Sequence, residues 1–151
     1  HSGKVPPVCA ITTVKHITLI DILSSRMLGA AGFLAHVFNN FLKWNISIDV
    51  IATSEVSVSL TVNTKSDLSG LIKDLEQASQ VTVKQNKAIV TIICDAAHSS
   101  AILASGFEAL ADEGINVQMI SQGASKVNIS MIVDDDQADK AVQILHQAYF
   151  D

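Results

Sequence analysis

The amino-acid sequence carries an internal duplication, and this feature constrains the fold more than any other. Three stretches of the first half align with three stretches of the second half, with offsets of 71, 69 and 71. The aligned pairs are 17–23 with 88–94, 37–51 with 106–120, and 56–60 with 127–131. Apolar positions coincide along them, as Phe38 does with Phe107. Such a repeat predicts two copies of one supersecondary unit.

Each copy shows one order of secondary structure. Alternating apolar residues predict strands, and apolar residues three or four positions apart predict helices. In the first copy the expected elements are a strand at 17–22, a helix at 32–43, strands at 46–51 and 56–62, a helix at 68–75 and a strand at 81–83. Asn45 is expected to end the first helix, and Ser66 and Asp67 are expected to cap the second. The order β-α-β-β-α-β is that of a ferredoxin-like α+β fold.

The second copy follows the same order and then stops one strand short. Its elements are expected at 88–94, 99–112, 115–120, 127–133 and 136–148. The N-terminal stretch 8–14 has no place in the first copy, so we expect it to supply the missing strand. The first unit (15–86) would then be inserted in the second (8–14 with 87–151). The alternative is an extra edge strand on the first unit.

Composition and motifs exclude several classes of function. The formal net charge is −5 without a basic block, so a nucleic-acid partner is disfavoured. No apolar run reaches the roughly 18 residues of a membrane span, and no membrane partner is expected. Phosphate-loop, dinucleotide and metal-ligand motifs are missing from the sequence, so we expect neither catalysis nor a cofactor or metal. Cys9 and Cys94 lie in apolar stretches and are expected to be reduced core residues.

Two segments carry information about binding. Residues 26–34 contain Gly29 and Gly32 and are expected to form a loop that opens a helix. Unpaired amides at a helix start suit a carboxylate. Asp49 interrupts an apolar strand and Glu55 follows at the next turn, so the two acids can pair with an ammonium group. Together the segments predict recognition of a zwitterion, against the alternatives of an ordinary glycine turn and two solvated acids.

These segments resemble the regulatory part of aspartokinases, the enzymes that phosphorylate aspartate at the head of lysine, threonine and methionine synthesis. The matching stretches are 27–38, 46–57 and, in the second copy, 116–130. The most specific motif is Thr-Ser-Glu-Val-Ser, which begins at Thr53. The resemblance covers residues 8–150 and is nearest to the monofunctional, lysine-sensitive type.

The resemblance implies two ACT domains, a homodimer formed through them, and lysine held at the dimer interface as a feedback inhibitor. Threonine and S-adenosylmethionine are the alternative effectors. It also implies a kinase domain of the same full-length chain, N-terminal to His1, so that the present chain is a regulatory fragment of a cytoplasmic enzyme, or of a plastid enzyme in a plant. The effector-binding residues that it implies are Met27, Gly32, Phe33, Leu34, Ser47, Ile48, Asp49, Ser54 and Glu55.

The sequence departs from the family pattern at a few positions. Ala30 stands where some lysine-inhibited relatives have Ser, which removes a side-chain hydrogen bond. The second copy has Gln118 in the place of Asp49 and Ala124 in the place of Glu55, so it should bind a cation poorly and contribute packing instead. Two other functions stay open, a ligand-free dimerisation module of a larger enzyme and an RNA-binding domain. The latter needs aromatic residues that the two central strands lack.

Overall fold

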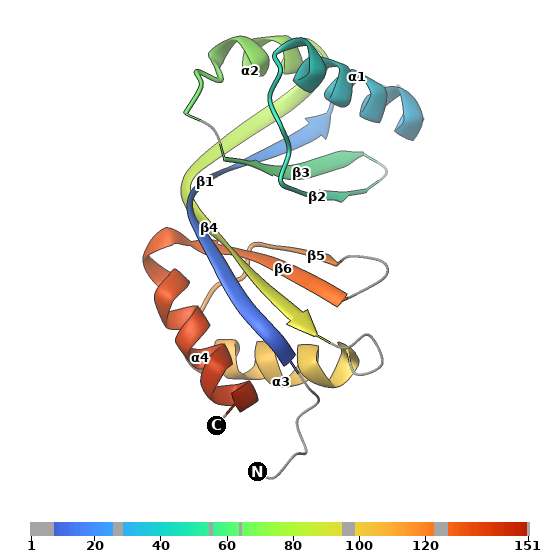
Figure 1. Cartoon of the computed structure of the whole chain (residues 1–151). Coiled ribbons are helices and arrows are strands. Elements are labelled where there is room, and N and C mark those ends of the chain that lie inside the picture. The colour runs from blue at the N-terminus through green and yellow to red at the C-terminus, as the bar shows by residue number, and fades with distance from the viewer. Residues whose placement is uncertain are drawn as a thin grey trace. The chain divides into compact units, whose positions relative to one another are not determined.

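Two long strands each contribute to two separate units of the fold. The computed structural model describes residues 8–25, 29–54, 56–63, 65–94, 99–122 and 127–150 (Figure 1). The chain divides into an inserted unit, Ile17–Gln85, and a host unit, which consists of the residues up to His16 together with those from Asn86. Strands β1 (Val8–Ser24) and β4 (Ser79–Cys94) each pass from one unit into the other.

The inserted unit is a four-stranded sheet with two helices on one face (Figure 1). The strand order is β2-β3-β1-β4, and β3 pairs antiparallel with both β1 and β2. The elements between its shares of β1 and β4 are α1 (Gly29–Lys43), β2 (Val50–Thr53), β3 (Ser57–Val62) and α2 (Ser69–Leu75). Side chains alternate along a strand, so every second residue of β1 and β3 faces the helices. The resulting core contains Ile20, Ile22, Val58, Leu60, Phe33, Val37 and Leu71.

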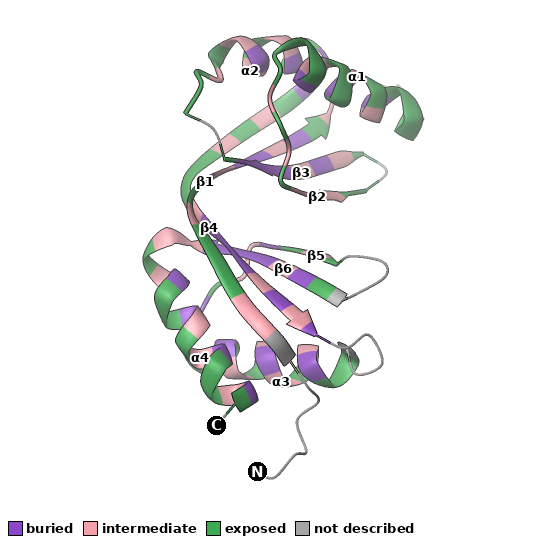
Figure 2. Ribbon diagram, viewed as in Figure 1, coloured by how far each residue is buried: buried purple, intermediate pink, exposed green. Residues whose placement is uncertain are grey.

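The host unit repeats this arrangement with the order β1-β4-β6-β5. Its further elements are α3 (Ser99–Asp112), β5 (Met119–Gln122), β6 (Val127–Asp134), a 3-10 turn (Asp135–Gln137) and α4 (Ala138–Phe150). The first half of β1 supplies the strand that the second copy lacked. The predicted α+β fold, two ferredoxin-like units with the first inserted in the second, is therefore confirmed. Burial in both units is concentrated on the sheet residues that face the helices (Figure 2).

The two long strands change unit at residues with an unusual backbone. His16 in β1 and Asn86 in β4 have positive φ angles of 62° and 61°, a conformation that Asn and His tolerate better than most residues. The backbone N–H of His16 donates to Asp135 Oδ1 at 3.0 Å, and its imidazole Nδ1 lies 2.9 Å from Asp135 Oδ2. The sequence predicted separate strands on either side of these residues. Both strands instead continue through them.

The first helix of each copy ends in the same way. At Asn45 (φ 53°) the N–H donates to Leu42 O, and the following amide of Ile46 donates to Phe41 O. Gly114 (φ 71°) and the residue after it make the equivalent pair of hydrogen bonds in the second copy. This is a Schellman motif, in which a left-handed residue satisfies the last carbonyls of the helix. The predicted role of Asn45 is confirmed.

The alignment of the first strands in the two copies is wrong by one residue. In the inserted unit Ile22 pairs with Val58, and in the host unit Ile92 pairs with Ile129. The third strands correspond at an offset of 71, so the first strands correspond at 70. Nearly every position of these strands is apolar, and the alternation that would fix the register is therefore weak. The correct offset makes Thr91 the counterpart of Asp21.

The second strand of each copy is shorter than its apolar pattern predicted. Strand β2 begins at Val50 instead of residue 46, because Ile46 and Ile48 pack against the core as an irregular segment after the helix. Strand β5 likewise begins at Met119 instead of residue 115. A segment that packs against a core shows alternating apolar and polar residues even where no neighbouring strand pairs with it. Within the described residues, no helix is long and apolar enough to cross a membrane.

Candidate functional site

The start of α1 presents backbone amides on an exposed surface. The helix begins at Gly29, which has a φ of 73°, and Gly29 and Gly32 are exposed. The first-turn amides of a helix have no partner within it, and this first turn carries no acidic residue. These amides and the positive end of the helix dipole suit an anion. Met27 lies outside the described residues.

Helix α1 begins at Gly29, three residues before the predicted start at residue 32. Gly32, Phe33 and Leu34 lie in the helix as predicted, because their apolar spacing continues the helical face that packs on the sheet. Phe33 is buried in the core of the inserted unit, and Leu34 packs against that core. The Phe33 side chain is therefore buried in this chain, whereas the first-turn residues of α1 are exposed.

Asp49 lies at a bend just before β2, and not within a strand as predicted. Its N–H donates to Thr61 O at 2.9 Å, and the next amide, of Val50, donates to Thr61 Oγ1 at 3.1 Å. These two bonds attach the bend to β3. The Asp49 residue is exposed, and partial desolvation raises the pKa of its carboxyl. Because desolvation disfavours the charged form relative to water, a cation near Asp49 would lower this pKa again.

The other predicted residues surround this strand. Ser47 is exposed, and Ile48 is half-buried against the core. Ser54 begins the turn from β2 to β3: its hydroxyl accepts from the Ser57 N–H at 3.2 Å and lies 2.7 Å from Ser57 Oγ. Ser54 therefore holds the turn closed. Glu55 lies outside the described residues.

One chain does not bring Asp49 next to the start of α1. The β2–β3 turn adjoins the end of β1, because Ser24 N donates to Val56 O at 2.8 Å, and α1 follows from that end. Asp49 pairs with Thr61 at the other end of β3. Strand β2 separates the two ends by its own length, roughly 13 Å at about 3.3 Å per residue. The acid and the helix start are thus at opposite ends of one edge strand.

In the second copy, the position of Asp49 is occupied by a neutral residue with its own partners. The Gln118 N–H donates to Ile132 O at 2.8 Å, as Asp49 does to Thr61. The Gln118 side chain donates to Asp134 Oδ1 at 2.9 Å, and Lys87 Nζ donates to the same oxygen at 2.5 Å. These two donors, Lys87 first, hold the pKa of Asp134 below its usual range. In the second copy, the Lys87 side chain thus supplies an ammonium group at this place.

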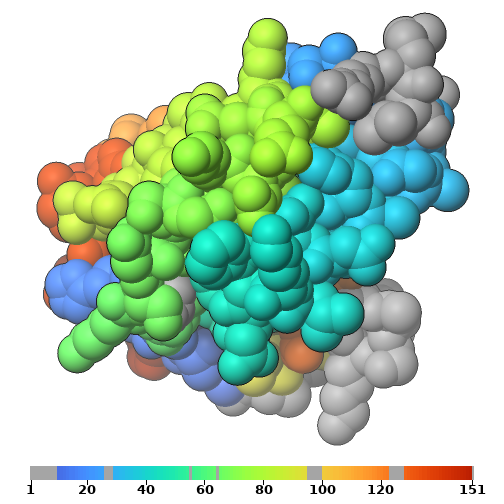
Figure 3. All heavy atoms as spheres, turned by 90° about the horizontal axis from the view of Figure 1, so that it is seen from above, coloured from blue at the N-terminus to red at the C-terminus, as the bar shows by residue number. Residues whose placement is uncertain are grey.

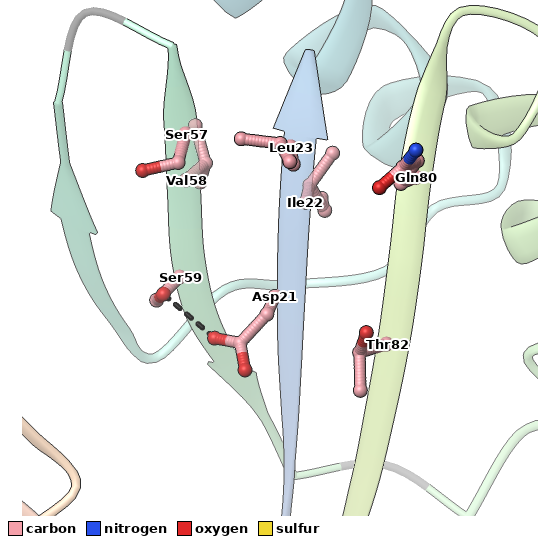
Figure 4. A pocket seen from close by; sticks show the side chains of 8 residues that line it. All are labelled: Asp21, Ile22, Leu23, Ser57, Val58, Ser59, Gln80 and Thr82. Carbon is pink, nitrogen blue, oxygen red and sulfur yellow. Dashed lines mark hydrogen bonds between the residues drawn. The ribbon is translucent and has the colours of Figure 1, made fainter. Parts of the chain in front are cut away.

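A pocket of about 140 Å³ lies on the open face of the inserted sheet, and the sequence analysis missed it (Figure 4). Ser59 Oγ donates to Asp21 Oδ1 at 2.7 Å, and Lys84 Nζ lies 3.2 Å from Asp21 Oδ2. The host unit has the neutral pair Thr91 and Ser130 at the equivalent place, 3.0 Å apart. The sequence does contain one signal for this pocket, because Asp21 is a single acid in an apolar strand. Because Lys84 already pairs with it, Asp21 is not a free cation site.

Metal binding finds no support in the part of the chain that the structure describes. Among those residues, no three His, Cys, Asp or Glu side chains lie close enough together to hold an ion. Cys94 is a buried thiol outside any disulfide, in line with its predicted place in the core. The side chain of Cys9 lies outside the described residues.

Comparison with known proteins agrees with this architecture. A family model described as an ACT domain matches residues 90–149. A solved structure described as a C-terminal regulatory domain of aspartate kinase from Porphyromonas gingivalis W83 is 31% identical, with a TM-score of 0.82, and the match covers 94% of this chain and 97% of that one. The chain belongs to the aspartokinase regulatory domains.

Whole aspartokinases contain this domain as one part. Chloroplastic aspartokinase 3 of Arabidopsis thaliana is 46% identical over 94% of this chain, and the chain spans 27% of its length. Escherichia coli aspartokinase III matches with a TM-score of 0.79 and 32% identity in a complex with lysine and aspartate, over 100% of this chain and 35% of that one. The chain thus spans about a quarter of the curated aspartokinases that it matches, and it corresponds to their regulatory part.

Proposed function

We propose that this chain is the module through which lysine regulates an aspartate kinase, and that lysine binds between two copies of the inserted unit. The observation that carries the proposal is the position of β2. This strand is the edge of the inserted sheet, with Asp49 before its first residue, and its last residue leads into the turn that adjoins the end of β1, from which α1 follows. Edge strands present unpaired backbone groups and can pair with a second copy.

A two-fold axis beside β2 would bring together what one chain keeps apart. Two copies of an edge strand related by a two-fold axis perpendicular to the sheet run antiparallel, so each Asp49 would lie near the α1 start of the partner. The helix amides would hold the carboxylate of lysine, and Asp49 with Glu55 would hold an ammonium group. The residues proposed to surround the ligand are Met27, Gly32, Phe33, Leu34, Ser47, Ile48, Asp49, Ser54 and Glu55.

The remaining parts of the proposal follow from the relatives. The complex of Escherichia coli aspartokinase III with lysine supports lysine as effector, over threonine or S-adenosylmethionine. A kinase domain in the same full-length chain would be the regulated partner, and residues 15–86 and 8–14 with 87–151 would be the two ACT units. The chloroplastic relatives support a plastid location in a plant source, and a cytoplasmic one otherwise. Lysine can shift the kinase only if it binds two subunit arrangements with different affinity.

Calorimetric titration of the 151-residue chain tests the choice of ligand. We expect saturable binding of one lysine per chain, with norleucine and lysinamide each binding at least tenfold more weakly. Norleucine lacks the side-chain ammonium and lysinamide lacks the carboxylate, and a charge-assisted hydrogen bond contributes about 1.5–3 kcal/mol. A dimeric chain that binds none of lysine, threonine and S-adenosylmethionine would contradict the proposal and favour a ligand-free dimerisation module.

A further inference from the structure

The host unit contains an ion pair in which the lysine is more deeply buried than its acid. Lys87 Nζ donates to Asp134 Oδ1 at 2.5 Å, and the Lys87 side chain is 14% exposed, against 44% for Asp134. The two residues face each other across β4 and β6. Lysine side chains are mostly exposed, because an ammonium group is strongly hydrated. The burial of Lys87 therefore goes beyond what an ordinary cross-strand ion pair requires.

The ammonium group of Lys87 is held beside the side chain of Gln118. Gln118 Nε2 donates to Asp134 Oδ1 at 2.9 Å, so the amide and the ammonium group share one oxygen atom. Gln118 is half-buried just before β5. The carboxylate of Asp134 thus holds a primary ammonium group at the tip of the Gln118 side chain.

The duplication identifies the equivalent position in the inserted unit. Gln118 corresponds to Asp49, since the backbone N–H of each donates to an equivalent carbonyl of β6 or β3. These two strands correspond at an offset of 71, so Asp134 corresponds to Asn63. Each copy therefore has one acid and one amide at these two positions, in the opposite order.

The lysine that completes this arrangement belongs to the host unit alone. At the offset of 70 that relates the first strands, Lys87 corresponds to Ile17, an apolar and fully buried residue. Among the ion pairs between described residues, none includes Asp49. Asp49 is exposed, in the segment between α1 and β2 that lies at the surface (turquoise in Figure 3). The two copies thus differ in whether an ammonium group comes from the chain itself.

We propose that Asp134 and Gln118 form a binding site for a primary ammonium group, that Lys87 of the same chain occupies this site, and that a free amino acid is thereby kept out of the second copy. The comparison with an effector site rests on the proposed role of Asp49. A tethered group acts at an effective concentration in the millimolar range, so an amino acid in solution competes poorly with it. The expected binding of one lysine per chain follows from this occupied position.

The Lys87→Ala variant tests the proposal, because it empties the site and n-propylammonium can refill it. The substitution removes Cγ, Cδ, Cε and Nζ, which correspond to the three carbons and the nitrogen of n-propylammonium. At ten times its dissociation constant, n-propylammonium chloride should raise the unfolding temperature of Lys87→Ala by about 3 °C or more, relative to the same concentration of sodium chloride. The unfolding temperature of the parent should not change.

Three controls separate the charge from other causes. n-Propanol has the shape of the probe without its charge, and it should not stabilise Lys87→Ala. The double variant Lys87→Ala/Asp134→Asn keeps the space but lacks the acid, and it should not respond to n-propylammonium. Lys15→Ala removes an ion pair of similar length, with Asp139, whose side chain is 80% exposed. It should not respond either, because no buried lysine stem leaves a space there.

A Lys87→Ala variant that n-propylammonium does not stabilise would overturn the proposal, as would an equal response to n-propanol or in any control variant. If Lys87→Ala is unfolded without the probe, n-propylammonium should restore its circular dichroism spectrum, and failure to do so would overturn the proposal equally.

Lysine titration of the parent separates this proposal from the proposed function. If n-propylammonium stabilises Lys87→Ala but the parent binds no lysine, the occupied site stands and the effector is wrong. If the parent binds lysine and n-propylammonium has no effect, only the occupied site is wrong.

Discussion

Gly106→Ala is expected to destabilise the chain by about 3 kcal/mol, because an added Cβ has no room in the host core. Gly106 lies in α3, and a Cβ there would be 2.0 Å from the hydroxyl of Tyr149 on α4. That hydroxyl donates to Ile102 O at 2.7 Å, so displacing the Tyr149 ring would also break a buried hydrogen bond. Burial of the hydroxyl also raises the pKa of Tyr149. Thermal and urea denaturation measure the loss.

Two further variants separate the clash from other causes. Gly32→Ala, at an exposed position of α1, is expected to stabilise the chain by up to about 1 kcal/mol, as alanine does within helices. Tyr149→Phe removes the oxygen that the new Cβ would meet, while the next atoms are 3.1 Å or more away. The double variant Gly106→Ala/Tyr149→Phe should therefore be more stable than Gly106→Ala alone. Additive effects would show that the clash is not the cause.

Asp49→Asn is expected to weaken lysine binding by about 10- to 100-fold while stability changes by less than about 0.5 kcal/mol. The substitution keeps the size of the side chain and removes the charge that would pair with the ammonium group. Because the pKa of Asp49 is raised, lysine affinity of the parent should fall on acidification from a higher pH than for an ordinary aspartate. This part of the pH dependence should be missing from Asp49→Asn. Calorimetry between pH 4 and 8 measures both.

The matched control for Asp49→Asn lies in the second copy. Gln118→Ala removes the side chain at the equivalent position and its bond to Asp134, and lysine binding should stay as in the parent. Equal loss in the two variants would point to a general effect on folding. Unchanged binding in Asp49→Asn would remove Asp49 from the site.

The duplication made the fold predictable from sequence. Two copies of one pattern, with a strand missing from one end and a spare strand at the other, left few arrangements, and the inserted topology followed. The end of the first helix was equally predictable from sequence, because Asn45 carries a local signal for the left-handed turn. These features depend on neighbours in the sequence, or on a count of elements.

Features that depend on register or on a second chain were not accessible in this way. The first strands are apolar on both faces, so alternation did not show that Asp21 corresponds to Thr91. The start of α1 was placed too late because small residues and glycines mark both loops and first turns. The separation of Asp49 from the α1 start follows from the length and direction of β2, which no single motif encodes.

The central claim is that each lysine site combines Asp49 of one chain with the α1 start of the other, and mixing two defective variants tests it most directly. Gly32→Glu places a negative charge at the helix start, which stabilises the helix but repels a carboxylate. Asp49→Asn and Gly32→Glu should each lose lysine binding. After subunit exchange of an equal mixture, half of the dimers combine both variants and contain one intact site. Calorimetry should then recover about a quarter of the parent's binding capacity. A mixture that binds no more lysine than the separate variants would contradict a site shared between chains.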